Sequence, residues 1–66
     1  MRTTTAMLNN KITYANQIMA DREPITNCEY NGFNHLRVNG ENIFTGTKKE
    51  CVEFLNGLVQ FYLLTR

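Results

Sequence analysis

The stretch that decides the fold runs from Leu36 to Gln60 and reads LRVNGENIFTGTKKECVEFLNGLVQ. It contains, in order, an alternating apolar segment, an Asn-Gly pair, a second alternating segment and a run with helical periodicity. Asn-Gly between alternating apolar residues is a strong hairpin signal, because a type I′ turn needs a positive φ at both central residues. The stretch therefore predicts two antiparallel strands followed by a helix.

The sequence TKKE, which begins at Thr47, has the form of a capping box. The hydroxyl of Thr47 can accept a hydrogen bond from the amide of Glu50, and the Glu50 carboxylate can accept one from the amide of Thr47. A polar stripe then continues through Gly57 without losing the helical phase, which favours one continuous helix. The alternative is that Asn56-Gly57 ends the helix and that residues 58–65 form a fourth strand.

A second Asn-Gly pair, Asn31-Gly32, extends the meander toward the N-terminus. The predicted strands are 25–30, 33–38 and 41–45. Two-residue loops at both turns then set the register. This register pairs Tyr30 with Phe33, Cys28 with His35, Leu36 with Ile43 and His35 with Phe44.

Both faces of the predicted sheet carry apolar side chains, because side chains alternate between the faces along each strand. One face is aliphatic and the other is largely aromatic. A sheet of this kind is covered on both sides, either by its own helices or by a helix and a partner. The aliphatic face holds Ile25, Leu36, Val38 and Ile43, and the aromatic face holds Cys28, Tyr30, Phe33, His35 and Phe44.

An amphipathic helix precedes the strands. Its apolar positions, Leu8, Ile12, Ala15 and Met19, recur at helical spacing. One of the threonines at 3–5 supplies the N-cap, and the helix ends around residue 20, before the chain's proline at 24. We therefore expect a single α+β domain over residues 1–66, ordered helix, three-stranded antiparallel meander, helix.

A domain of 66 residues buries only about 60% of the surface of its unfolded chain, so it needs a disulfide, a metal or a second copy for stability. The chain has two cysteines, Cys28 and Cys51, and one histidine, His35. Thiolates and imidazole therefore cannot complete a four-ligand zinc site in one chain, and we expect no metal and no cofactor. Reduced cysteines are favoured over a disulfide between the two, which leaves self-association as the favoured source of stability.

The second helix is apolar over more than half of its circumference, more than one sheet face needs. We expect part of this surface to join two copies in a homodimer, unless the first helix covers it all. The residues assigned to self-association are Phe54, Leu58, Phe61 and Tyr62.

Composition also bears on location and partners. Seven Lys or Arg residues and six Asp or Glu residues give a formal net charge of +1, and the only basic cluster is Lys48-Lys49, whereas a nucleic-acid-binding surface needs a basic footprint. Residues 1–11 lack the apolar core of a signal peptide, and the apolar run 58–64 is far shorter than the roughly 20 residues that span a bilayer. We expect a soluble, cytoplasmic protein without a membrane partner.

The cross-strand pair Cys28 and His35 is the nearest approach to a catalytic motif, since a thiol beside an imidazole is the start of a nucleophilic site. The sequence supplies no clear carboxylate to orient His35 and no glycine-rich turn at a helix start for an oxyanion hole. We therefore expect no catalytic residues and no enzyme activity.

The aromatic face is the predicted partner-binding surface. Exposed rings on a small antiparallel sheet serve either as a protein interface or as a platform on which single-stranded bases stack. The near-neutral charge favours the protein interface. The residues assigned to partner binding are Tyr30, Phe33, His35, Arg37 and Phe44.

The segment Asn42–Gly57, NIFTGTKKECVEFLNG, resembles the strand, Gly-Thr, helix ending of many small bacteriophage and prophage accessory proteins. The resemblance covers about a quarter of the chain and implies binding to a host macromolecule that is blocked or redirected, including host defence systems. The resulting hypothesis is a non-catalytic protein-binding module, an inhibitor or modulator of a host complex in the host cytoplasm. The alternative is a single-stranded nucleic-acid-binding protein that uses Tyr30, Phe33 and Phe44, and a minor third is a structural component of a larger particle.

Overall fold

The computed structural model describes residues 2–66. It confirms the α+β architecture, in which one helix precedes and one helix follows, along the chain, a three-stranded antiparallel sheet of order β1-β2-β3. The elements are α1 (Thr5–Ile18), β1 (Thr26–Tyr30), β2 (Phe33–Val38), β3 (Glu41–Gly46) and α2 (Lys48–Thr65).

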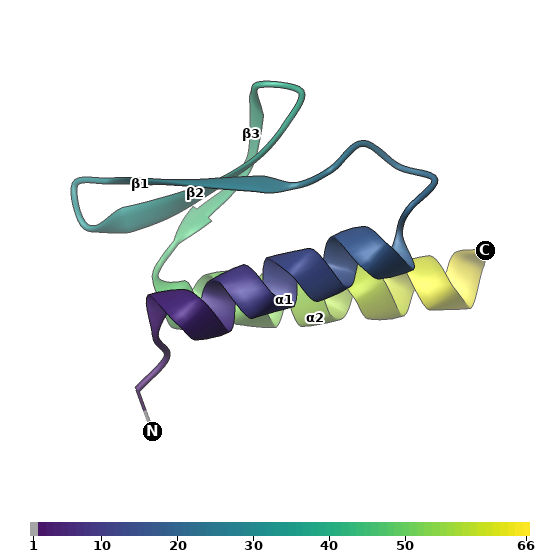
Figure 1. Cartoon of the computed structure of the whole chain (residues 1–66), viewed down its shortest axis with the longest axis horizontal. Coiled ribbons are helices and arrows are strands. Elements are labelled where there is room, and N and C mark those ends of the chain that lie inside the picture. The colour runs from purple at the N-terminus through teal and green to yellow at the C-terminus, as the bar shows by residue number, and fades with distance from the viewer. Residues whose placement is uncertain (1) are drawn as a thin grey trace.

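Both helices lie on the same side of the sheet. Figure 1 shows α1 and α2 side by side and running in the same direction beneath the strands, with the tip of the β2–β3 hairpin farthest from them. Of the two arrangements expected, the one in which the domain's own helices cover both faces is therefore wrong, and coverage of the second face by a partner stays a prediction. Within the described residues, the opposite face of the sheet has no covering element.

The core lies between the helix pair and the sheet. The four apolar positions predicted from spacing, three in α1 and the C-cap Met19, are all buried, and Leu36 in the central strand is buried completely. The helix begins where expected, because Thr4 Oγ1 accepts a hydrogen bond from the Met7 amide at 3.1 Å, and it ends at Ile18, two residues before the predicted end. The buried apolar residues are Leu8, Ile12, Ala15, Met19, Ile25, Leu36, Cys51, Leu55 and Val59.

The capping box at the start of α2 is confirmed. The Glu50 amide donates to Thr47 Oγ1 at 3.2 Å, and the Thr47 amide donates to Glu50 Oε1 at 2.8 Å. The helix then runs without interruption through Gly57 to Thr65, so the alternative of a fourth strand over 58–65 is wrong. Gly57 faces solvent while Leu55 and Val59 stay in phase with the core, and this burial outweighs the low helix propensity of a single glycine.

Thr47→Ala is expected to lower the free energy of unfolding by about 1 kcal/mol, because it removes the acceptor of the Glu50 amide. Thr13→Ala is the matched control, since Thr13 is exposed inside α1 and alanine there only improves helix propensity. Urea denaturation followed by circular dichroism measures both. Equal midpoints for the two variants would show that the cap does not stabilise α2.

Both turns adopt the predicted type I′ geometry. The φ values are 53° and 78° at Asn31 and Gly32, and 55° and 76° at Asn39 and Gly40, which match the positive φ that this turn requires at both central positions. The first hairpin therefore has the expected register, with Tyr30 opposite Phe33 and with Cys28 opposite His35.

The second hairpin differs from its predicted register. Leu36 pairs with Phe44 and Arg37 with Asn42, which leaves Ile43 as the extra residue of a β-bulge. The predicted pairs of Leu36 with Ile43 and of His35 with Phe44 are therefore wrong, and His35 lies opposite Thr45 instead. An extra residue reverses the alternation of side chains beyond it.

The bulge turns Phe44 toward the helices. Its ring stacks on Phe54 of α2 with 4.5 Å between the ring centroids, and it packs against the core half-buried. Burying an aromatic ring against another ring is more favourable than leaving it in water, so packing against α2 accounts for the shift in register.

Candidate functional site: the open face of the sheet

The face of the sheet that points away from the helices is called here the open sheet face. Asn34 and Leu36 of β2 are buried on the helix side, so the alternate residues of this strand and their neighbours across the sheet face outward. Beside the first turn, at one end of this face, Tyr30 is 66% exposed and Phe33 is 49% exposed, and the two stand opposite each other. The open sheet face consists of Thr26, Cys28, Tyr30, Phe33, His35, Arg37, Asn42 and Thr45.

His35 is held in place from two sides. Its ring centroid lies 6.5 Å from that of Tyr30, and its Nδ1 lies 3.0 Å from Thr45 Oγ1. Thr45 Oγ1 also accepts a hydrogen bond from Asn42 Nδ2. The contact with Thr45 uses Nδ1 of His35, which leaves Nε2 for a partner.

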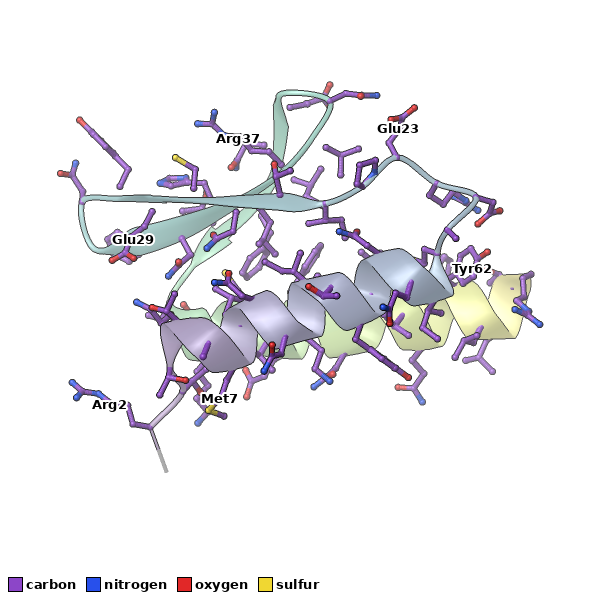
Figure 2. The ribbon with its side chains drawn as sticks, viewed as in Figure 1. Arg2, Met7, Glu23, Glu29, Arg37 and Tyr62 are labelled. Atoms are coloured by element: carbon purple, nitrogen blue, oxygen red, sulfur yellow. The ribbon has the colours of Figure 1, made fainter. Side chains whose placement is uncertain are left out.

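Arg37 gives the open sheet face a positive charge. The side chain is exposed, and no ion pair joins it to a carboxylate within residues 2–66. Glu29 points to the helix side, where the Lys48 Nζ lies 3.7 Å from its Oε1. Figure 2 shows Arg37 and Glu29 on opposite sides of the sheet. The open sheet face therefore combines exposed rings with a cation and carries no acidic side chain.

Four of the five residues predicted to bind a partner lie on this face. Phe44 is the exception, because the bulge places it against Phe54 on the other side. The aromatic surface is correspondingly smaller than predicted and contains two exposed rings and one imidazole.

The two cysteines are free and lie in different environments. Cys28 is exposed on the open sheet face, whereas Cys51 is buried with its Sγ 3.8 Å from the carbonyl oxygens of Asn34 and Gly46. Burial raises the pKa of the Cys51 thiol, which keeps it protonated and poorly nucleophilic. Core and outer face are separated by the sheet, so the alternative of a disulfide between these cysteines does not fit the fold.

The surface assigned to self-association is largely packed inside the domain. Phe54, Leu58 and Tyr62 are half-buried against the core, and only Phe61, at 65% exposure, projects fully into solvent. The first helix and the sheet thus cover most of the wide apolar stripe of α2.

Tyr62 also joins α2 to the segment that follows α1. Its hydroxyl donates a hydrogen bond to Asp21 Oδ1, and the Arg22 guanidinium lies over its ring, 5.4 Å from the centroid. The shared hydrogen bond lowers the pKa of Asp21 and raises the pKa of Tyr62. The two groups therefore fasten the exit of α1 to the C-terminal half of α2.

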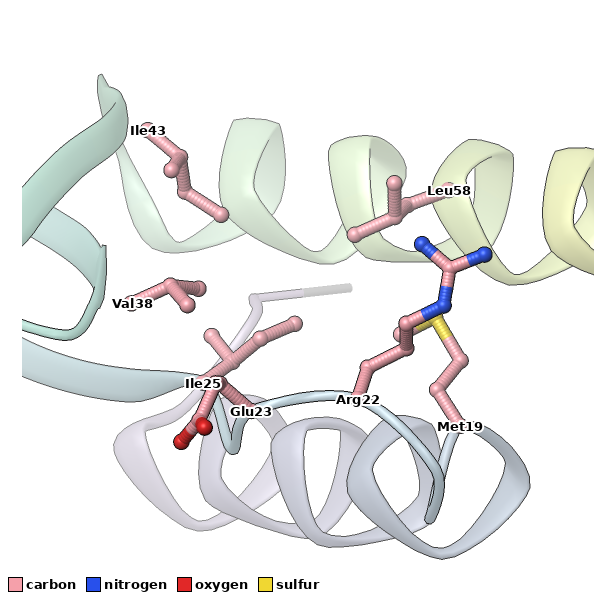
Figure 3. A pocket seen from close by; sticks show the side chains of 7 residues that line it. All are labelled: Met19, Arg22, Glu23, Ile25, Val38, Ile43 and Leu58. Atoms are coloured by element: carbon pink, nitrogen blue, oxygen red, sulfur yellow. The ribbon is translucent and has the colours of Figure 1, made fainter.

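A pocket of about 340 Å³ opens where the β2–β3 hairpin diverges from the helices (Figure 3). Its walls are aliphatic, and its charged side chains are Arg22, already placed over Tyr62, and Glu23, which points away from the interior. The lining contains no set of groups suited to metal binding or catalysis. The pocket is lined by Met19, Arg22, Glu23, Ile25, Val38, Ile43 and Leu58.

Within residues 2–66, no cluster of three or more His, Cys, Asp or Glu side chains is arranged to hold a metal ion. No helix of this part of the chain combines the length and the apolar character that crossing a membrane requires. Comparisons of the chain with protein-family models, curated proteins and solved structures gave no match. The assignment of the candidate site therefore depends on its geometry.

Proposed function

We propose that the protein is a non-catalytic protein-binding module that holds its partner on the open sheet face. The observation that carries the proposal is the adjacent pair Tyr30 and Phe33, whose rings are 66% and 49% exposed on a face that no element of residues 2–66 covers. Aromatic residues and arginine dominate the binding energy of protein interfaces, and Arg37 stands on the same face.

Charge indicates what the partner offers. The open sheet face has one unpaired arginine and no carboxylate, so the complementary surface presents acidic groups beside apolar ones. A carboxylate can take both parallel N–H groups of Arg37 while apolar side chains cover the two rings.

The resemblance of Asn42–Gly57 to bacteriophage accessory proteins supports a bacterial host protein as the partner. In this proposal the module acts as an inhibitor or modulator by occupying a surface of a host complex, including a defence complex, in the host cytoplasm. A module of this size can block access to a site without chemistry of its own.

Single-stranded nucleic acid is the competing ligand, since bases stack on exposed rings and a phosphate can bind Arg37. Two observations weigh against it. Phe44, the third ring of the expected platform, is turned away against Phe54, and the net charge of +1 leaves few cations to follow a phosphate backbone.

The test compares two aromatic surfaces of the same domain. The double variant Tyr30→Ser, Phe33→Ser removes the rings of the open sheet face, and Phe61→Ser removes a ring of similar exposure from α2. We expect an immobilised double variant to capture at least about tenfold less of a defined partner from a bacterial lysate, because hot-spot rings contribute about 2 kcal/mol or more each. Phe61→Ser should capture as much as the wild type.

Capture that is equal for all three proteins, or lost only with Phe61→Ser, would contradict this assignment. A parallel measurement uses fluorescence anisotropy with labelled single-stranded DNA and RNA at physiological salt. Micromolar binding that disappears in the folded double variant would replace the protein partner with nucleic acid.

A further inference from the structure

Strand β1 forms one edge of the sheet. Along it, the backbone N–H and C=O groups of successive residues point alternately toward β2 and away from the sheet. A two-residue turn closes on a hydrogen-bonded pair, which here is Tyr30 with Phe33. Cys28 and Thr26, in the same phase, also direct their N–H and C=O groups toward β2. The N–H and C=O groups of Asn27 and Glu29 therefore point outward from the sheet.

The residue before β1 confirms this alternation. Ile25 has the same phase as Asn27, and the Asn16 side chain binds both of its backbone groups. The Ile25 amide donates to Asn16 Oδ1 at 2.8 Å, and Asn16 Nδ2 donates to the Ile25 carbonyl at 3.0 Å. At Ile25, the outward backbone groups of the sheet edge are therefore satisfied from within the domain.

The rest of the edge stays open. Among residues 2–66, no side chain hydrogen-bonds the backbone of Asn27 or Glu29, so two N–H and two C=O groups remain free to pair. The strand contains no proline and no bulge, two of the devices that protect an edge strand, and its one charged side chain, Glu29, is paired with Lys48 at 3.7 Å. The opposite edge, β3, has its bulge at Ile43.

We propose that β1 pairs antiparallel with β1 of a second copy of this chain, about a two-fold axis that passes beside Cys28. Cys28 is the middle residue of the five-residue strand, so the symmetric register uses its whole length. Thr26 then lies opposite Tyr30 of the other copy, Asn27 opposite Glu29, and Cys28 opposite Cys28. Two three-stranded sheets become one sheet of six strands.

Complementarity identifies a second copy as the occupant of this edge. In the symmetric register Asn27 and Glu29 form hydrogen-bonded pairs, which use all four open backbone groups of each copy. Asn27 Nδ2 donates one proton to Asn34 Oδ1 at 3.3 Å, and its second proton is available to the Glu29 carboxylate that this register brings opposite Asn27. Each Glu29 brings its own Lys48, 3.7 Å away, so the two carboxylates near the axis are compensated.

Pairing through β1 is also compatible with the packing of α2 against the core. Self-association through that helix had been expected, but three of the four residues assigned to it, Phe54, Leu58 and Tyr62, pack against the core, and the exposed apolar side chains of α2 are confined to its C-terminal end, at Phe61, Leu63 and Leu64. Pairing through β1 leaves α2 as it is and joins the open sheet faces of the two copies into one continuous surface. The dimer is thus compatible with partner binding and does not depend on it.

Glu29→Pro is the decisive variant, because it removes an outward N–H and leaves the hydrogen bonds between β1 and β2 intact. We expect sedimentation equilibrium to show a wild-type dimer at concentrations up to several hundred micromolar, and Glu29→Pro to raise its dissociation constant at least tenfold. Glu29→Lys, which keeps the N–H but replaces each compensated carboxylate with a cation beside Lys48, should act in the same direction. Phe61→Glu should leave the dissociation constant unchanged.

The proposed register can be tested by cross-linking at Cys28, because it places the Cys28 residues of the two copies opposite each other. Cα atoms of a non-hydrogen-bonded pair are about 4.5 Å apart, within the range of a disulfide. Diamide accepts two electrons and two protons from two thiols and becomes a hydrazine, so it should link the dimer through Cys28 and fail with Cys28→Ser. A wild type that is monomeric at these concentrations, or a dimer that persists in folded Glu29→Pro and dissociates with Phe61→Glu, would overturn the proposal.

Discussion

Leu36→Ala is expected to remove a large share of the stability of the domain. Leu36 is completely buried in the central strand, between the two helices and the rest of the sheet. Truncating such a leucine costs about 3 to 5 kcal/mol, the lost transfer free energy plus the cavity left behind. A domain of this length has a total stability of roughly 3 to 10 kcal/mol, so one such loss removes a large share of it.

Leu64→Ala is the matched control, since the same atoms are removed from a side chain that is 78% exposed. Its effect should stay within about 0.5 kcal/mol. Urea titration followed by circular dichroism measures both variants. If the two lost similar stability, the sheet would not pack on the helix pair as described.

The elements were predictable because their signals are local. The Asn-Gly pairs at 31 and 39 set both turns through the φ values that they tolerate. The TKKE box marked the first turn of α2, and four apolar positions at helical spacing marked the buried side of α1. Each of these signals lies within a few neighbouring residues, so no knowledge of the tertiary fold was needed.

The bulge was not predictable in the same way. Phe44 faces inward because Phe54, ten positions further along the chain, offers a ring to stack on. A strict alternation of strand residues contains no information about such a contact. The side of the sheet on which α1 packs could not be predicted either. Apolar side chains on both faces are compatible with the two helices on one face or with one helix on each face.

The candidate site was predictable where strand alternation alone defines it. Tyr30, Phe33, His35 and Arg37 belong to the first hairpin, whose register follows from its turn, and they share the open sheet face. The pocket and the backbone contacts of Asn16 could not be found in this way. Both bring together segments that are separate in sequence. The helical periodicity places Asn16 as a polar residue near the apolar side of the helix, but it does not indicate that the side chain binds the backbone of Ile25.

Asn16→Ala is expected to lower the free energy of unfolding by about 2 kcal/mol, although alanine is a better helix former. The variant leaves the N–H and C=O groups of Ile25 without the two hydrogen bonds that the Asn16 side chain supplies, and each partly buried unpaired group costs about 1 to 3 kcal/mol. Asn10→Ala is the control, since Asn10 is exposed on the same helix and its replacement changes helix propensity alone. Urea denaturation measures the difference, and amide hydrogen exchange at Ile25 should accelerate only in Asn16→Ala. If both variants proved equally stable, the backbone of Ile25 would not depend on the hydrogen bonds from Asn16. The expected loss would mean that the Asn16 side chain has two effects. It stabilises the domain, and it limits the free backbone groups of the β1 edge to those of Asn27 and Glu29.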